Sequence, residues 1–225
     1  MSGPTANGRW VCLDVGETLI DETRIWSVWA DVLGIPRLTL MAALGAMIAR
    51  GSEHGSVFGI FDLEEADWRA LAPVVEERYG GFQERDLYPD VREMLVALPK
   101  AGYRVAVLAN QPASRTAELR ALRIEPEVMA MSDELGVAKP APAFFTRALE
   151  LMGGPDPADV AYVGDRVDND VLPALAAGMR SVWIRRGPWG AIQVPPPGGP
   201  PALIVDSLSE LTARIDEAWT GSRLA

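Results

Sequence analysis

Four apolar segments of the chain each run into a polar side chain that could bind an anion or a cation. These side chains are Asp14, Asn110, Ser132 and Asp165. A buried strand that delivers a single carboxylate to a turn displays either a nucleophile or a metal ligand. Loops at the carboxyl ends of parallel strands line the sites of open α/β sheets, so we expect these four residues to meet in one crevice.

The elements that must position these side chains alternate between strands and helices. Helical composition follows Ser114 and Pro142 and precedes Ser181, whereas the apolar segments have the length of strands. The expected strands are residues 10–13, 104–108, 128–131, 160–163 and 181–184, with a last one in ALIVD, 202–206. This alternation predicts an α/β fold with a parallel sheet covered on both faces.

The interval between the first two strands is far longer than a crossover helix requires. Residues 21–85 lack strand alternation and are rich in Trp, Ala, Leu and Glu. We therefore expect a small all-helical cap subdomain at 21–85, set over the strand ends, and a core domain made of residues 1–20 and 86–225. The proline-rich run VPPPGGPP at 194–201 predicts a stiff surface loop.

The overall composition excludes several classes of function. The chain has 225 residues, 48% of them hydrophobic, and a formal net charge of −10, which disfavours nucleic acid and anionic membranes as partners. Its longest apolar run, LTLMAALGAMIA, is too short to cross a bilayer. One cysteine, Cys12, allows no intrachain disulfide, and the N-terminus has no secretion signal, so we expect a cytoplasmic location. The oligomeric state stays open.

Four sequence motifs occur in a set order: LDVGETL, VLANQ, GVAKPAPAFF and VGDRVDND. Together with the helical insertion after the first motif, they make the chain resemble the haloacid dehalogenase superfamily of hydrolases over nearly its whole length. The resemblance implies a Rossmann-like three-layer core with a helical cap. It also implies hydrolysis of a small phosphorylated metabolite through an aspartyl-phosphate.

The resemblance gives these motifs roles in catalysis and in binding Mg²⁺. Asp14 would be the nucleophile, and Lys139 would be a fixed ammonium that offsets the repulsion between Asp14 and phosphate. Asp14 and Asp165 are hard oxygen ligands suited to Mg²⁺, with the carbonyl of Gly16 added by resemblance. Asp170 would bind the metal directly or hold a metal-bound water. Among only two lysines in the chain, Lys139 stands out because nineteen arginines supply the other positive charges.

The first and second motifs depart from the pattern of the family's phosphatases. Gly16 stands where these phosphatases carry a second aspartate as general acid and base, and Ala109 replaces a hydroxyl residue that contacts phosphate. Asn110 and Thr18 remain as candidates for substrate binding. Glu17, Asp21 or the cap could supply the missing acid, and we count Glu17 as a candidate catalytic residue, although a solvated turn carboxylate is its simpler interpretation.

Three functions are compatible with these residues. The first is a magnesium-dependent phosphatase with a relocated acid or a substrate that needs none. The second is a catalytically impaired protein that binds phosphate and metal or a partner. The third is a dehalogenase that breaks a carbon–halogen bond, which the metal-site carboxylates disfavour. His54, the only histidine, is expected to be an exposed loop residue.

Overall fold

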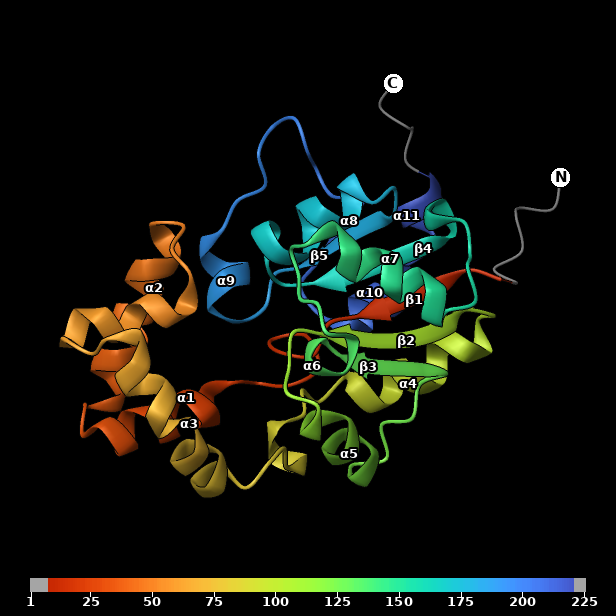
Figure 1. Ribbon diagram of the computed structural model, residues 1–225. Coiled ribbons are helices and arrows are strands. Elements are labelled where there is room, and N and C mark those ends of the chain that lie inside the picture. The colour runs from red at the N-terminus through yellow and green to blue at the C-terminus, as the bar shows by residue number, and fades with distance from the viewer. Residues whose placement is uncertain (1–7, 221–225) are drawn as a thin grey trace, which may run out of the picture.

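The first strand lies in the middle of a sheet of six parallel strands. The computed structural model describes residues 8–220, and its strands run in the order β3-β2-β1-β4-β5-β6 (Figure 1). The strands are β1 Trp10–Leu13, β2 Arg104–Ala109, β3 Val128–Met131, β4 Val160–Gly164, β5 Arg180–Ile184 and β6 Leu203–Val205. The α/β fold with a parallel sheet is confirmed, and the predicted strands agree with the observed ones to within one or two residues.

Both faces of the sheet are buried, which explains why the strands are almost continuously apolar. In β1, Val11 and Leu13 belong to one cluster of buried side chains. Trp10 and Cys12, which point the opposite way, belong to the other cluster. A layer of helices therefore covers each face, and the Cys12 thiol lies within the core.

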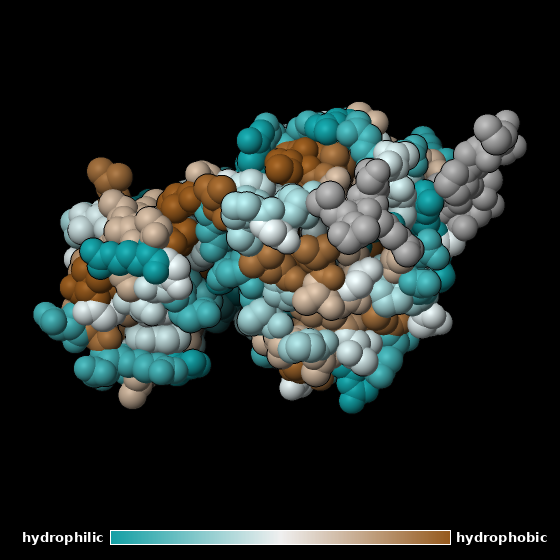
Figure 2. All heavy atoms as spheres, turned by 90° about the horizontal axis from the view of Figure 1, so that it is seen from above, coloured by the Kyte–Doolittle hydropathy of each residue, from teal (hydrophilic) through white to brown (hydrophobic). Residues whose placement is uncertain are grey.

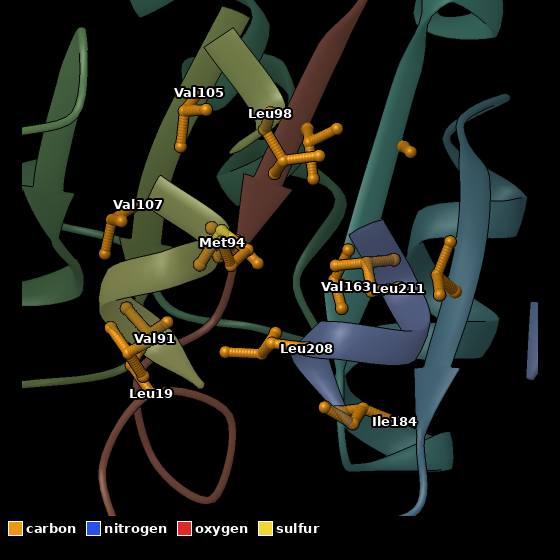
Figure 3. Close-up of a cluster of buried hydrophobic side chains, with 14 of the residues drawn as sticks. Leu19, Val91, Met94, Leu98, Val105, Val107, Val163, Ile184, Leu208 and Leu211 are labelled. Atoms are coloured by element: carbon orange, nitrogen blue, oxygen red, sulfur yellow. The ribbon is translucent and has the colours of Figure 1, made fainter. Parts of the chain in front are cut away.

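Figure 3 shows the first of these clusters, where α4 and α10 pack on the strands. On the other face, α7 contributes Phe144 and Phe145 to the second cluster. The core helices are α4 Val91–Lys100, α5 Ser114–Ala121, α6 Ser132–Leu135, α7 Pro142–Leu151, α8 Leu172–Ala176, α9 Gly187–Ile192, α10 Leu208–Arg214 and α11 Glu217–Thr220, with short 3₁₀ turns at Glu84–Asp86 and Pro157–Asp159. As predicted, the run 194–201 is a loop.

One predicted core helix begins differently from the sequence expectation. The segment NDVLPALAAG starts in a π-helical turn, Val167–Val171, before α8. Here the amides of Asp170 and Val171 both donate to the carbonyl of Arg166, at 2.8 and 3.1 Å. Such wide turns are common at functional sites, and this one places Asp170 in the site described below.

The segment between β1 and β2 forms a helical group beside the sheet (Figure 1). It consists of α1 Thr23–Leu33, α2 Arg37–Ala49, a 3₁₀ helix His54–Phe61 and α3 Glu65–Tyr79. These helices share their own apolar cluster, which Trp189 of α9 joins from the core. Figure 2 shows two masses of atoms that meet at a narrower waist. We call residues 21–85 the helical insertion.

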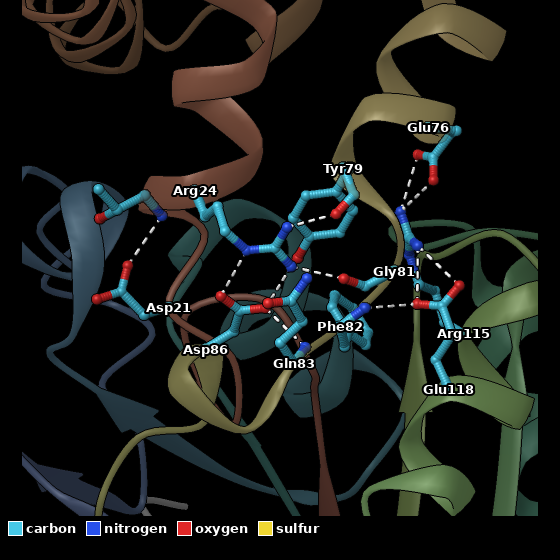
Figure 4. Close-up of polar contacts among 11 residues, drawn as sticks. Asp21, Arg24, Glu76, Tyr79, Gly81, Phe82, Gln83, Asp86, Arg115 and Glu118 are labelled. Carbon is cyan, nitrogen blue, oxygen red and sulfur yellow. Dashed lines mark hydrogen bonds and ion pairs between the residues drawn. The ribbon is translucent and has the colours of Figure 1, made fainter.

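Two guanidinium groups, one half-buried (Arg24) and one buried (Arg115), connect the helical insertion to the core (Figure 4). Arg24 of α1 binds both carboxylate oxygens of Asp86 and the carbonyls of Tyr79 and Gly81. Arg115 of α5 binds Glu76 of α3 and Glu118 through paired contacts of 2.7–2.9 Å. These contacts restrain both ends of the helical insertion where the chain returns to the core.

In the described part of the chain, no single helix is long and apolar enough to cross a membrane. Helices α1 and α2 reach that length only when taken together, and they meet at a bend of 115°.

Candidate active site

The site lies at the carboxyl ends of the three central strands. Because β1 pairs with both β2 and β4, the residues that follow them, Asp14, Asn110 and Asp165, emerge side by side. The amide of Asp14 also donates to the carbonyl of Val163 at 2.9 Å, which fixes the Asp14 backbone against β4. All three residues line one cavity, so the predicted convergence is confirmed for them.

Lys139 forms the electrostatic centre of the site. Its ammonium Nζ lies 2.7 Å from Oδ1 of Asp14 and 2.5 Å from Oδ1 of Asp170, with only 4% of the residue exposed. Burial alone would lower the pKa of Lys139, but the two carboxylates outweigh it and hold the pKa above its ordinary value. Lys139 is therefore a fixed positive charge beside Asp14.

Asn110 holds Lys139 in place rather than projecting freely into the cavity. Its Oδ1 accepts from the Lys139 amide at 2.7 Å, and its Nδ2 donates to the Lys139 carbonyl at 2.8 Å. This paired contact locks the loop between β3 and α7 to the end of β2. The amide still lines the cavity, so its contact with substrate stays a prediction.

Three carboxylates, those of Asp14, Asp165 and Asp170, offer ligand atoms within 4.8 Å of one another. Asp165 is 2% exposed, and its Oδ2 has no hydrogen-bond partner. Burial, followed by the charges of Asp170 and Asp14, raises the pKa of Asp165 well above its ordinary value. An unpartnered buried carboxylate oxygen beside two further acids fits a hard divalent cation, which would offset the mutual repulsion.

The two oxygens of Asp170 already have protein partners. Lys139 donates to Oδ1, and the amide of Arg166 donates to Oδ2 at 3.0 Å. Burial raises the pKa of Asp170 to about 6, even though Lys139 opposes the shift. Gly164 allows this packing, since a Cβ there would lie 2.3 Å from Oδ2 of Asp170. Asp170 is thus built into the site as a partner of Lys139, and direct contact with a metal stays a prediction.

Glu22 occupies the space left empty by the side chain that Gly16 lacks. A Cβ at residue 16 would lie only 2.4 Å from Oε1 of Glu22. The Glu22 carboxylate also accepts a long hydrogen bond, 3.4 Å, from Gln111. Burial, followed by the charges of Glu17 and Asp14, raises the pKa of Glu22 to about 7. An acidic side chain therefore lies next to residue 16, supplied from the start of α1.

Sequence reasoning missed Glu22, although it named Asp21 and the cap as sources of an acid. The spacing of six residues between Gly16 and Glu22 does not predict that the two are neighbours. They become neighbours only because the turn at 16–20 folds the chain back toward residue 16. That turn is visible in the structure as bonds from the amides of Leu19 and Ile20 to the carbonyl of Val15. Asp21 itself turns away and accepts from the amide of Thr23.

Glu17 is buried, so its interpretation as a solvated turn carboxylate is wrong. The residue has a φ of 51° and is 5% exposed. Its carboxylate accepts from the Tyr88 hydroxyl at 2.5 Å and from the Glu22 amide at 3.1 Å. Burial raises the pKa of Glu17, although these hydrogen bonds oppose the shift. A Cβ at Gly187 would overlap Glu17, so this carboxylate is tightly packed. Glu17 also lines the cavity and fixes the backbone of Glu22.

Thr18 is fully buried, and its hydroxyl has no hydrogen-bond partner. It does not belong to the cavity lining, unlike Gly16, whose carbonyl was assigned to the metal by resemblance. Binding of substrate by Thr18 and coordination of the metal by the Gly16 carbonyl both stay predictions.

The helical insertion closes the cavity opposite the strand ends. The cavity has a volume of about 350 Å³ and is lined by both the core and the insertion. His54 lies at its edge, exposed as expected, with its ring 6.3 and 6.5 Å from those of Trp26 and Trp189. Two arginines of the helical insertion are engaged elsewhere, because Arg24 binds Asp86 and Arg37 binds Asp31.

A family model described as haloacid dehalogenase-like hydrolase matches residues 9–178. This range covers more than half of the chain and includes Asp14, Asn110, Lys139, Asp165 and Asp170. The chain belongs to the haloacid dehalogenase-like hydrolases.

Curated relatives of this hydrolase are named as phosphatases. The glyceraldehyde 3-phosphate phosphatase of Pyrococcus furiosus is 29% identical over 202 residues, which cover 82% of this chain and 83% of the relative. Phosphoglycolate phosphatase 1 of Pseudomonas aeruginosa is 28% identical over 93% of this chain and 80% of its own. The alignment with the glyceraldehyde 3-phosphate phosphatase of Methanopyrus kandleri, 38% identical, spans 44% of this chain and less than half, 44%, of that relative.

Solved structures of haloacid dehalogenase-like hydrolases share the fold. A predicted phosphoglycolate phosphatase of Haemophilus somnus superposes with a TM-score of 0.72 at 22% identity, covering 95% of this chain and all of that one. The L-2-haloacid dehalogenase of Xanthobacter autotrophicus superposes with a TM-score of 0.65 at 19% identity, covering 92% and 98%. The same fold therefore occurs in a protein named as a phosphatase and in one named as a dehalogenase. Which of the two reactions such a fold supports depends on the side chains of the site.

Proposed function

We propose that this hydrolase is a magnesium-dependent phosphatase that acts on a small phosphorylated molecule through a covalent phosphate on Asp14. One observation carries the proposal: the Asp14 carboxylate lies against a buried ammonium and beside two more buried carboxylates. A nucleophilic carboxylate meets repulsion from a phosphate, and a fixed positive charge next to it reduces that repulsion.

The covalent step would begin at the oxygen of Asp14 that Lys139 leaves unbound. Lys139 donates to Oδ1, so Oδ2 attacks phosphorus while the bond from phosphorus to the leaving oxygen breaks. The leaving alkoxide takes a proton and departs as an alcohol. Water then attacks the phosphorus of the aspartyl-phosphate, which releases inorganic phosphate and restores the Asp14 carboxylate.

Asp14 and Asp165 would hold Mg²⁺, with the Gly16 carbonyl as a further oxygen ligand and Asp170 nearby. When bound, the ion supplies positive charge that stabilises the transferring phosphoryl group. The proposal is supported by the unpartnered Oδ2 of Asp165 and by the all-oxygen character of the donor set.

Glu22 is the residue best placed to give and take the proton. Its carboxyl group lies where a side chain on residue 16 would begin, and it lines the same cavity as Asp14. Glu17 also lines the cavity, but its carboxylate already accepts hydrogen bonds from the Tyr88 hydroxyl and the Glu22 amide. We therefore assign proton transfer to Glu22 and the positioning of Glu22 to Glu17.

The test is hydrolysis of acetyl phosphate and of an aryl phosphate after chelation, with and without added Mg²⁺. We expect turnover only with Mg²⁺, and a loss of more than about 10³-fold in Asp14→Asn. Intact mass after rapid acid quenching should show a phosphoryl adduct on the wild type and none on Asp14→Asn. Asp159→Asn, at an exposed position outside the site, is the matched control and should keep full activity.

Other outcomes would favour the alternatives. Binding of phosphate and Mg²⁺ without turnover or adduct would indicate an impaired binding protein. Release of halide from a 2-haloacid without Mg²⁺, lost in Asp14→Asn, would indicate a dehalogenase. Small molecules rather than nucleic acid or membrane as partners belong to the same proposal, which the charge of −10 supports. The cytoplasmic location stays a prediction.

A further inference from the structure

The part of the cavity that lies away from Lys139 is walled by aromatic rings. We call Trp26, Trp29, Phe58, Trp68 and Trp189 the aromatic wall; all five line the cavity. The ring of Phe58 lies 4.8 Å from that of Trp29 and 5.1 Å from that of Trp68, measured between centroids. The wall is therefore one continuous packed surface rather than five separate side chains.

This surface is part of the rigid structure of the helical insertion. Trp26 is 8% exposed, Phe58 2% and Trp189 4%, and all three belong to the apolar cluster of the insertion. Trp29 and Trp68 are half-buried, pack on Phe58, and present the accessible faces of the wall. Rings held by packing do not have to be ordered when a ligand binds. The cavity volume of about 350 Å³ is at the lower end of the range for small-molecule sites and accommodates a ring in addition to a phosphate.

The cationic side chains of the lining all have carboxylate partners. Arg115 binds Glu76 and Glu118, and Arg166 binds Asp168 at 2.7 Å. Lys139 binds Asp14 and Asp170. Among the residues that line this cavity, none is a cation left for a second anionic group of a substrate.

Carboxylates in the lining would repel such a group. Glu17, Glu22 and Glu53 line the cavity outside the cluster of Asp14 and Asp165. Glu76 also lines it but is paired with Arg115. An anionic substrate group buried here without a partner would meet both the cost of desolvation and this negative potential. The cavity is therefore unsuited to carboxylate-bearing phosphate esters.

We propose that the substrate is the phosphate ester of an alcohol that carries an aromatic ring and no second negative charge. The inference depends on the phosphatase function proposed above and adds the class of its substrate. The ring would stack on the aromatic wall, where aromatic pairs gain energy beyond the burial of their area. Phosphoglycolate, in the name of one relative, carries the carboxylate that this cavity lacks the means to bind.

The test compares kcat/KM for three esters: 2-phenylethyl phosphate, n-propyl phosphate and phosphoglycolate. The first two release alcohols of similar leaving ability, so their difference reports on binding of the ring. We expect 2-phenylethyl phosphate to exceed n-propyl phosphate by at least about tenfold, from burial of the phenyl group. Phosphoglycolate should fall below n-propyl phosphate.

Trp29→Ala tests the aromatic wall directly. It should lower the ratio of kcat/KM for 2-phenylethyl phosphate to that for n-propyl phosphate by about tenfold. Trp29→Leu, which keeps most of the bulk but removes the π surface, is a second variant if Trp29→Ala unfolds. Trp219→Ala removes another half-buried tryptophan, on the far side of the core beside Tyr103, and should change neither rate.

Asp14-dependent hydrolysis of the three esters at similar rates, or a preference for phosphoglycolate, would overturn the inference and leave the phosphatase function standing. Turnover confined to acetyl phosphate would also overturn it. Absence of all Asp14-dependent hydrolysis, acetyl phosphate included, would remove the phosphatase function and this inference together.

Discussion

At the scale of single residues, we propose that Glu22 performs the proton transfer that an aspartate in place of Gly16 could perform. Glycine leaves room beside Asp14, and the Glu22 carboxylate enters that room from the start of α1. Glu17 holds the arrangement in place because it binds both the Glu22 amide and Tyr88. In the proposed mechanism, Glu22 therefore replaces through space the aspartate that residue 16 lacks.

Replacing Glu22 by Gln should lower turnover of an alkyl phosphate by roughly 10²- to 10⁴-fold, because the leaving alkoxide loses its proton donor. Formation of the adduct from acetyl phosphate should persist, since acetate leaves without protonation, and the adduct should accumulate. Stopped-flow turnover together with intact mass measures both effects. Asp21→Asn, one residue away and turned from the cavity, is the control.

A double variant separates a chemical role of Glu22 from a structural one. Gly16→Asp alone should be destabilised, because the new Cβ overlaps the Glu22 carboxylate. Gly16→Asp combined with Glu22→Gly should recover part of the lost turnover, since a carboxylate returns to the same space. If the double variant is folded and no more active than Glu22→Gly, proton transfer by Glu22 is contradicted.

At the scale of elements, buried ion pairs join the helical insertion to the core. Asp86 is 3% exposed at its side chain, and its partner Arg24 is 19% exposed. Arg24 also bonds two backbone carbonyls at the end of α3, so it holds together the two chain segments that leave and re-enter the core.

Arg24→Met should therefore reduce the free energy of unfolding by about 3–5 kcal/mol, because it leaves the Asp86 carboxylate buried and unpaired. Urea denaturation followed by circular dichroism measures the change. Arg37→Met breaks an exposed pair, in which the side chains are 61% and 45% exposed, and should lower the free energy of unfolding far less than Arg24→Met does, because water screens the pair. Equal losses in the free energy of unfolding would show that the Arg24 contacts stabilise the fold no more than an exposed ion pair does.

At the scale of the whole molecule, the cavity exists because two separately packed parts meet over the strand ends. The insertion has its own apolar cluster, and Trp189 is the core residue that enters it. Gly45 of α2 also approaches α9, since a Cβ there would lie 3.6 Å from Ile192. The α2 to α9 contact thus sets how the aromatic wall faces Asp14.

Trp189→Ala should loosen this contact without unfolding the sheet. We expect faster amide hydrogen exchange in α1 and α2, because the cavity left by a buried tryptophan weakens their packing. Exchange in β1 and β4 should stay slow, as the side chains of these strands belong to the two apolar clusters of the sheet and not to that of Trp189. Uniformly faster exchange, sheet included, would argue against separate packing of the insertion.

The sequence by itself determined the sheet, its central strand and the acidic residues at the strand ends. Apolar periodicity specifies which segments are buried on both faces, and parallel pairing places their carboxyl ends at one edge. Asp14, Lys139, Asp165 and Asp170 could be named because they follow these strands or lie in the quoted motifs. Such information is local, so a single chain contains it.

Only the tertiary structure decided the remaining features of the site. In the folded structure Glu17 is buried, Glu22 lies beside Gly16, and the Asn110 side chain accepts a hydrogen bond from the Lys139 backbone. The tertiary structure also assembled the aromatic wall from α1, α3, the 3₁₀ helix and α9, and paired Arg115 with Glu76 across 39 positions. The physical reason is that turn geometry and packing between distant segments set these distances, and neither leaves a periodic pattern in the sequence.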